Sequence, residues 1–200
     1  MSTPTSIYRR AFAAGALRQG EIVSNVLEAR LRLETIYASP PVVDYTRHEY
    51  AVVVSQDCDL DWDWNARMSG DKQDKLLSGI LFCEAKPADR LAYERGYNRR
   101  ERNLLRQNRD ERYQFLQKVD FESDLQENGV PELVVDFKRY FSLSAEEAYF
   151  RLENKELQRR CLFEYPYLQH LITRFWNFQG RVALPEQHLS ERYIPPEQTE

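Results

Sequence analysis

The stretch that decides the fold runs from Tyr50 to Asp63 and reads YAVVVSQDCDLDWD. After Tyr50 and Ala51 come three consecutive valines, and the chain then changes abruptly to Ser55-Gln56-Asp57-Cys58-Asp59. Val-rich runs are typical of buried strands, and polar groups at the end of such a strand are held in place by it. We therefore expect a central strand at 49–56 and a candidate site directly after it.

Other segments around this strand also read as extended. Residues 27–34 alternate apolar and polar side chains, which is the period of a half-buried strand. Ser39-Pro40-Pro41 predicts a break. Residues 61–75, which are rich in Asp, Asn, Lys and Gly, predict a loop or a short helix. The further strands are expected at 20–37, 76–85, 112–118 and 132–141.

Three helical features follow along the chain. Residues 86–112 hold nine Lys or Arg against five acids and few aliphatic residues, which predicts an exposed, basic helical insertion. Ser144 and Glu147 have the spacing of a capping box and should start a helix. A long C-terminal helix is expected from Pro166, frayed or kinked at Gly180 and stopped at Pro185.

The sequence therefore predicts an α+β fold. A small, mostly antiparallel, barrel-like sheet carries a basic helical insertion at 86–112 and a long C-terminal helix, all within one domain over 20–186. Residues 1–19 should form a flexible or helical segment and 187–200 a tail. The 200 residues, 42% of them hydrophobic, are enough for one core.

Composition narrows the function classes. The net charge is only −4, so the chain as a whole is not a polyanion binder. Its three cysteines lack close spacing, which argues against a disulfide framework and favours a cytoplasmic location. No apolar run approaches the roughly 20 residues that cross a bilayer, so no membrane partner is expected. The sequence gives no reason to expect a cofactor.

The candidate catalytic residues are Cys58, Asp59 and His170. A thiol needs a base and a favourable environment to act as a nucleophile, and the neighbouring carboxylates would disfavour the thiolate. Catalysis thus requires the tertiary fold to bring His170 to the strand end. The alternative for the acidic cluster is a charged loop without function. Cys58 and Cys83 are themselves expected to be small buried side chains, because free cysteine is among the most buried residue types.

No metal site is assigned. The alternating aspartates from Asp57 resemble a calcium loop, but its sixth and twelfth positions would hold Trp62 and Met68 instead of Gly and Glu. A looser cation site at Asp57 and Asp59 stays open. A zinc ion needs about four ligands, which the three dispersed cysteines and one of His48 or His170 could supply. The sequence has no CxxC spacing to support such a site.

Basic residues suggest a second candidate surface. His170, Arg174, Asn177 and Arg181 share one face of the C-terminal helix and could bind phosphate; the alternative is a solvated helix face. Arg159-Arg160 could extend this basic surface. The expected nucleic-acid-binding residues are Arg99, Arg100, Arg174 and Arg181.

Two stretches together resemble a group of uncharacterised bacterial proteins. In that group a strand ends in Ser or Thr, two residues and Cys-Asp, as in VVVSQDCDL, where these positions are Ser55, Cys58 and Asp59. A final helix carries Pro-Tyr, His-Leu and Arg-Val-x-Leu-Pro, as in EYPYLQHLITRFWNFQGRVALP. The resemblance implies a family, but it implies no activity.

The segment Gly20-Glu21-Ile22-Val23 and the strand at Tyr50–Ser55 also resemble MazF/PemK-type toxin ribonucleases. This resemblance implies a small, SH3-like barrel and a link to toxin–antitoxin or phage-defence systems. The toxin's Arg-Pro is replaced by Glu49-Tyr50 or Tyr50-Ala51 at this register, and its Ser or Thr on the next strand is replaced by Cys83.

Three functions are therefore expected in turn. The first is a nucleic-acid-associated or defence-type module, and the second is a small hydrolase or metal-dependent enzyme centred on Cys58, Asp59 and His170. The third is a non-catalytic module that docks a partner protein, for which Trp62 and Trp64 are the residues to inspect, because exposed tryptophans mark interfaces.

Overall fold

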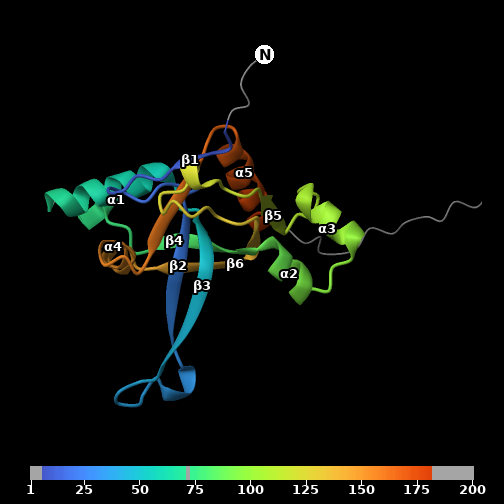
Figure 1. The fold of residues 1–200 in the computed structure, drawn as a ribbon. Helices are drawn as coiled ribbons and strands as arrows, with labels where there is room; N and C mark the ends of the chain where they lie inside the picture. The colour runs from blue at the N-terminus through green and yellow to red at the C-terminus, as the bar shows by residue number, and fades with distance from the viewer. Residues whose placement is uncertain (1–5, 71–72, 182–200) are drawn as a thin grey trace, which may run out of the picture.

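The computed structural model describes residues 6–70 and 73–181 (Figure 1). The strands are β1 (Tyr8–Arg10), β2 (Ile22–Leu31), β3 (Val43–Val53), β4 (Ile80–Pro87), β5 (Tyr113–Leu116), β6 (Leu133–Leu143) and β7 (Gln158–Phe163). The α-helices are α1 (Asp57–Ser69), α2 (Ala88–Glu94), α3 (Arg99–Arg106), α4 (Ala145–Glu153) and α5 (Tyr167–Gln179). Short 3-10 turns lie at Leu33–Thr35, Gln73–Lys75 and Phe121–Ser123.

The seven strands form one antiparallel sheet in the order β1-β7-β2-β3-β4-β6-β5, which confirms the α+β fold. Every strand contributes to one core cluster, from Tyr8 on β1 to Leu116 on β5. The Tyr8 hydroxyl donates to the carbonyl of Gln117, just after β5, at 3.0 Å. Within 6–70 and 73–181 no ladder joins β1 to β5, so the sheet curls without closing.

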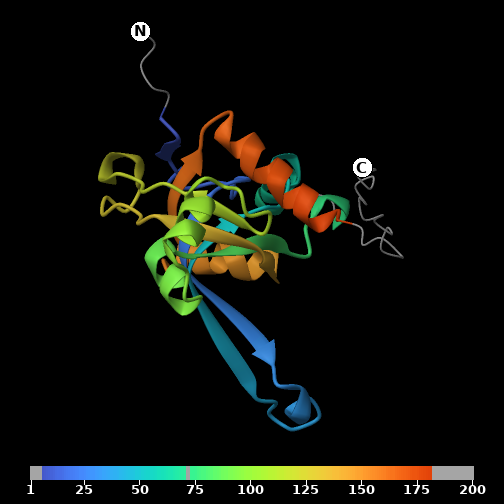
Figure 2. The same cartoon turned by 90° about the vertical axis from the view of Figure 1, so that its right-hand side faces the viewer.

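Helices cover both faces of the sheet (Figure 2). Leu171, Phe175 and Phe178 of α5 pack in the cluster on one face. On the other face, Leu60 of α1 and Ala148 of α4 pack in a second cluster. The insertion 86–112 is helical as predicted, and α2 and α3 bury a small cluster of their own against β5 and β6.

Two predicted helix signals are confirmed. Ser144 Oγ accepts a hydrogen bond from the Glu147 amide at 3.1 Å, and α4 follows directly. The long C-terminal helix is α5, which ends at Gln179 next to Gly180. Pro185 and the tail at 187–200 lie outside the described residues.

The acidic segment after the central strand is a helix: over 61–75, where a loop or a short helix was expected, α1 continues to Ser69 and a 3-10 turn lies at Gln73–Lys75. In α1 the buried residues Leu60, Asp63 and Ala66 recur every third position, on one helix face. Asp57 and Asp59 lie in the first turn, where carboxylates stabilise the positive end of the helix dipole. Gly70 then adopts a left-handed conformation (φ 66°) and ends the helix.

The N-terminal segment, expected to be flexible or helical, holds strand β1 and buries Leu17. Arg159 fixes the loop that precedes β2, because its guanidinium donates to the carbonyls of Gly15 and Ala16 and pairs with buried Glu21. The adjacent Arg160 points to the other side of the strand and pairs with Asp124 at 2.7 Å.

Strand β7 itself was not predicted. Both of its arginines are only 5% exposed. The expectation that Arg159-Arg160 extend a basic surface was therefore wrong, since their hydrogen-bonding capacity is used inside the fold.

Beyond Ser24 and Tyr50, strands β2 and β3 pair only with each other. We call residues 27–47 the arm. The arm projects away from the body in both ribbon views (Figures 1 and 2).

No helix in the described ranges is both long and apolar enough to cross a membrane.

Candidate functional site

The three predicted catalytic residues lie on two different helices. Cys58 is exposed in the first turn of α1, where its thiol lies 3.7 Å from Asp59 Oδ1 and 3.9 Å from Gln56 Oε1. His170 is exposed on α5. Within the described residues, no hydrogen bond or ion pair joins His170 to Cys58 or Asp59. Partial burial, and then the charge of Arg174, lower the pKa of His170, so the imidazole is neutral near pH 7.

The cysteines divide into one exposed and two buried thiols. The expected burial is confirmed for Cys83 and wrong for Cys58. Burial raises the pKa of both Cys83 and Cys161 well above the ordinary range, which keeps these thiols protonated. Among the described residues, no group of three or more His, Cys, Asp or Glu is arranged to hold a metal ion.

Two of the four predicted nucleic-acid-binding arginines serve the fold. Arg174 donates to the carbonyls of Asn108, Asp110 and Tyr113, at 2.5 to 2.9 Å, and so ties α5 to the segment before β5. The Arg181 guanidinium lies 3.6 Å from the centre of the Phe178 ring and donates to the Phe178 carbonyl. Arg174 is thus engaged within the fold, whereas the Arg181 side chain is 52% exposed and pairs with Glu111 at 3.7 Å.

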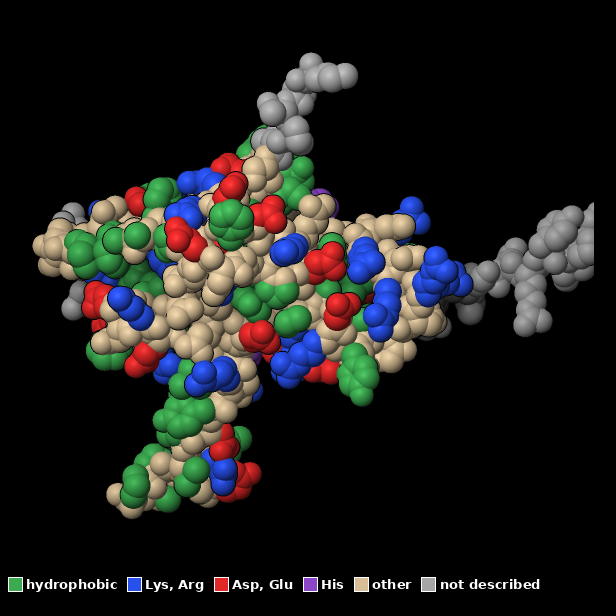
Figure 3. Space-filling model, in the orientation of Figure 1, with side chains coloured by type: hydrophobic (Ala, Val, Ile, Leu, Met, Phe, Trp, Pro, Cys, Tyr) green, Lys and Arg blue, Asp and Glu red, His purple; other side chains and the backbone are tan. Residues whose placement is uncertain are grey.

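The other two, Arg99 and Arg100, are exposed in the first turn of α3. Together with Arg95 and Arg109 they have no carboxylate within ion-pair distance in the described part of the chain. Basic side chains gather over this insertion in the space-filling view (Figure 3). On this face, four of the arginines of the insertion form a group of exposed side chains.

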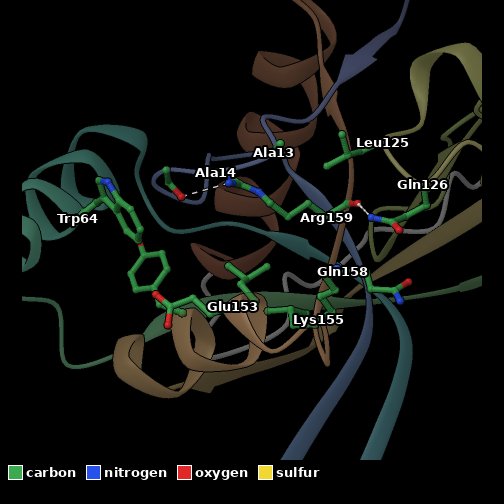
Figure 4. A pocket seen from close by; sticks show the side chains of 13 residues that line it. Ala13, Ala14, Trp64, Leu125, Gln126, Glu153, Lys155, Gln158 and Arg159 are labelled. Atoms are coloured by element: carbon green, nitrogen blue, oxygen red, sulfur yellow. Dashed lines mark hydrogen bonds between the residues drawn. The ribbon is translucent and has the colours of Figure 1, made fainter.

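A cavity of about 590 Å³ lies between the N-terminal loop, α1, α4 and the start of β7. Trp64 packs edge-on to Tyr149 on one side, with ring centroids 4.9 Å apart, while Arg159 reaches from β7 to the loop at Ala14 and Gly15 (Figure 4). The volume suits a small molecule. Burial raises the pKa of Tyr149 to about 12, so its hydroxyl stays protonated. Glu153 and Lys155 are the other charged side chains that line the cavity besides Arg159, so it offers binding surface with both an acidic and a basic group at its wall.

The arm carries the most conspicuous exposed surface. Register pairs Leu27, Ala29 and Leu31 on β2 with Arg47, Tyr45 and Val43 on β3. Directly paired residues lie on one face of a ribbon, so this face, the apolar face, is mainly hydrophobic. Figure 3 shows apolar side chains along the arm down to its tip. Its large exposed hydrophobic residues are Leu31, Leu33, Ile36, Tyr37, Val42 and Tyr45.

The opposite face of the arm is polar and paired internally. Arg32 binds Asp44 through both its Nε and Nη2 atoms, at 3.1 and 2.5 Å. Arg30 binds Glu28 at 2.8 Å. The Arg32 side chain holds the pKa of Asp44 below its usual range. The two faces together make the arm an amphipathic ribbon with its apolar side uncovered.

A buried histidine anchors the base of the arm. His48 lies between two carboxylates, with Nε2 3.2 Å from Glu28 and Nδ1 3.4 Å from Glu84, and it stacks on Phe141 at 4.1 Å. Burial raises the pKa of Glu84, but the hydrogen bond from His48 and the charge of Arg139 outweigh it and leave a net lowering. This cluster ties β2, β3 and β4 together where the ribbon leaves the sheet.

Of the tryptophans singled out as docking residues, Trp62 is 57% exposed on α1, whereas Trp64 lines the cavity. Sequence reasoning missed the arm as a site. The alternation at 27–34 predicts a half-buried strand, but a periodicity does not state which surface covers the apolar side.

Comparisons with models of protein families, with curated proteins and with solved structures found no match for this chain.

Proposed function

We propose that this protein is a non-catalytic interaction module that docks a partner protein through its arm. One observation carries the proposal. The alternation at 27–34 is typical of a half-buried strand, yet Leu31 is 52% and Leu33 76% exposed. Single exposed hydrophobic residues are common, but a contiguous apolar surface marks an interaction site. A partner would supply the burial that the body of the protein does not.

Charge favours a protein over nucleic acid as the occupant of the arm. Residues 27–47 hold three arginines and three acids, so the arm has no net charge. Arg30 and Arg32 are already paired with carboxylates, which leaves Arg47 as the one arginine of the arm without such a partner among the described residues. Binding to a phosphate backbone depends on several uncompensated positive charges, and a single arginine on the arm does not supply them. Its tyrosines and leucines suit an apolar protein surface instead.

A photo-crosslinking amino acid at position 37 tests the proposal in cells that produce the protein. Tyr37 is 99% exposed at the arm tip, and Tyr165, which is 72% exposed beside α5, is the matched control position. We expect a discrete cross-linked protein species from position 37 and none from position 165. The proposal fails if position 37 gives no species beyond the control, or if replacing Leu31 with Asp leaves the cross-link yield unchanged.

A second candidate function, nucleic-acid association, is favoured by the exposed arginines of the insertion. Arg95, Arg99, Arg100 and Arg109 form no ion pair within the described ranges. Phosphate contacts weaken steeply with salt. We expect RNA or DNA to bind at low ionic strength and the Arg99→Glu/Arg100→Glu variant to lose most of that binding, whereas Arg9→Glu, on β1, serves as control. Equal binding by both variants would remove this candidate.

A further inference from the structure

We infer that the partner of the arm is a second copy of this chain, packed apolar face against apolar face about a two-fold axis. The inference rests on the proposed function and identifies the partner that covers the arm. An amphipathic ribbon with one apolar side is complemented by an identical side, as in the packing of two sheets face to face. A two-fold interface uses the same patch on both subunits, which a single projecting arm provides.

The exposed area is of the order that such an interface needs. Six large hydrophobic side chains of the arm are between 40% and 99% exposed, and the two tyrosines among them, Tyr37 and Tyr45, are 99% and 64% exposed. At about 150–250 Å² for each aromatic side chain, these two tyrosines alone offer roughly 250–400 Å². A standard protein–protein interface covers about 800 Å² on each partner, and Leu31, Leu33 and Ile36 add their exposed surface to the tyrosines. The Leu31–Val43 pair of each arm would form the centre of the interface.

Charges at the two ends of the arm fit the two-fold arrangement. Arg47, at the base of the apolar face, donates to Asn25 Oδ1 at 2.8 Å and has no carboxylate partner among the described residues. Glu34, at the tip, likewise has no basic partner there.

The two-fold arrangement turns these two charges toward each other. A two-fold axis through the Leu31–Val43 pair, the last pair of the β2–β3 register, reverses one arm over the other. Arg47, four residues toward the base from Val43, then faces the partner's tip, where Glu34 lies in the 3-10 turn Leu33–Thr35. Each subunit would contribute one cation and one anion, giving two symmetric ion pairs.

Sedimentation equilibrium of the purified full chain tests the inference through a charge exchange. We expect a dimer for the wild type and for the control Phe150→Ser, which removes an exposed ring on α4. Leu31→Asp should weaken dimerisation by at least about tenfold. Arg47→Glu and Glu34→Arg should each weaken it about fivefold, and the double variant should restore it, because both ion pairs re-form with reversed sign.

Two results would overturn the inference: a monomeric wild type at about 100 μM, well above typical dissociation constants of standard interfaces, or a double variant no better than the single ones. A monomer whose position 37 still cross-links a different protein would defeat the second copy as occupant and leave the proposed function standing. A monomer without cross-links would defeat both.

Discussion

At the scale of single residues, the buried ion pairs of β7 hold distant loops in place. Arg160 Nη2 donates to Asp124, Asn128 and the Gly129 carbonyl, and Nη1 donates to Ser24. Removing one partner of a buried pair leaves an uncompensated charge. We expect Arg160→Met to lower the free energy of unfolding by about 3–5 kcal/mol, measured by urea denaturation. Arg109→Gln, an exposed and unpaired control, should change it by less than about 0.5 kcal/mol.

The same pair gives stability a defined pH dependence. Burial raises the pKa of Asp124, but the hydrogen bonds from Arg160 and from the Gln126 amide outweigh it, so the net pKa lies below that of an exposed aspartate. Since the folded-state pKa is the lower one, the pair stabilises the fold above about pH 4 and loses this contribution as pH falls through the folded-state value. Thermal unfolding between about pH 6 and pH 2 should show this loss, and Asp124→Asn should flatten it. A loss of equal size in Asp124→Asn would contradict the assignment.

The thiols give a third test at this scale. Cys58 is exposed, whereas Cys83 and Cys161 are buried with raised pKa values. A thiol reagent attacks the accessible thiolate, so the folded protein should take up one label per chain, at Cys58, and the unfolded protein all three. Mass spectrometry of the labelled chain measures the number. Rapid labelling of Cys83 or Cys161 in the folded protein would contradict the burial of these two thiols in the core.

At the scale of elements, the arm should be dispensable for folding and essential for docking. Its distal part pairs with no other strand among the described residues, and a two-stranded ribbon alone is marginally stable. Glu28 and Thr46 are directly paired, so replacing 29–45 with Asn-Gly would close the hairpin with a favoured turn. We expect this variant to unfold cooperatively within about 1 kcal/mol of the wild type by urea denaturation and to lose dimerisation. A collapse of stability would show that the arm belongs to the core.

The same elements show how far the sequence could predict the fold. Val52, Val53 and Val54 predicted the central strand because a continuous β-branched run is buried on both faces. The spacing of Leu171, Phe175 and Phe178 predicted α5 for an equally local reason. Strand β7 was missed because Arg159 and Arg160 resemble surface residues until their partners Glu21 and Asp124 are known. Those partners come from distant segments, and local periodicity carries no information about them.

At the scale of the whole molecule, the chain is a curled antiparallel sheet covered by helices, with one amphipathic ribbon left outside. Leu31 and Tyr45 lie on the face that the sequence pattern marks for burial, and the body of the protein leaves them exposed. The predicted catalytic residues are not brought together: Cys58 and His170 lie on separate helices, and no hydrogen bond or ion pair joins them among the described residues. The proposed docking role rests on the exposed apolar face of the arm.

Amide hydrogen exchange over residues 26–48 tests this central claim most directly, because it reports whether the arm is covered. The protein should be measured twice, as dilute purified chain and as the assembly isolated from cells under native conditions. We predict fast exchange in the dilute chain and strong protection in the assembly, with residues 145–153 of α4 unchanged between the two. Equally fast exchange of the arm in both samples would contradict the account.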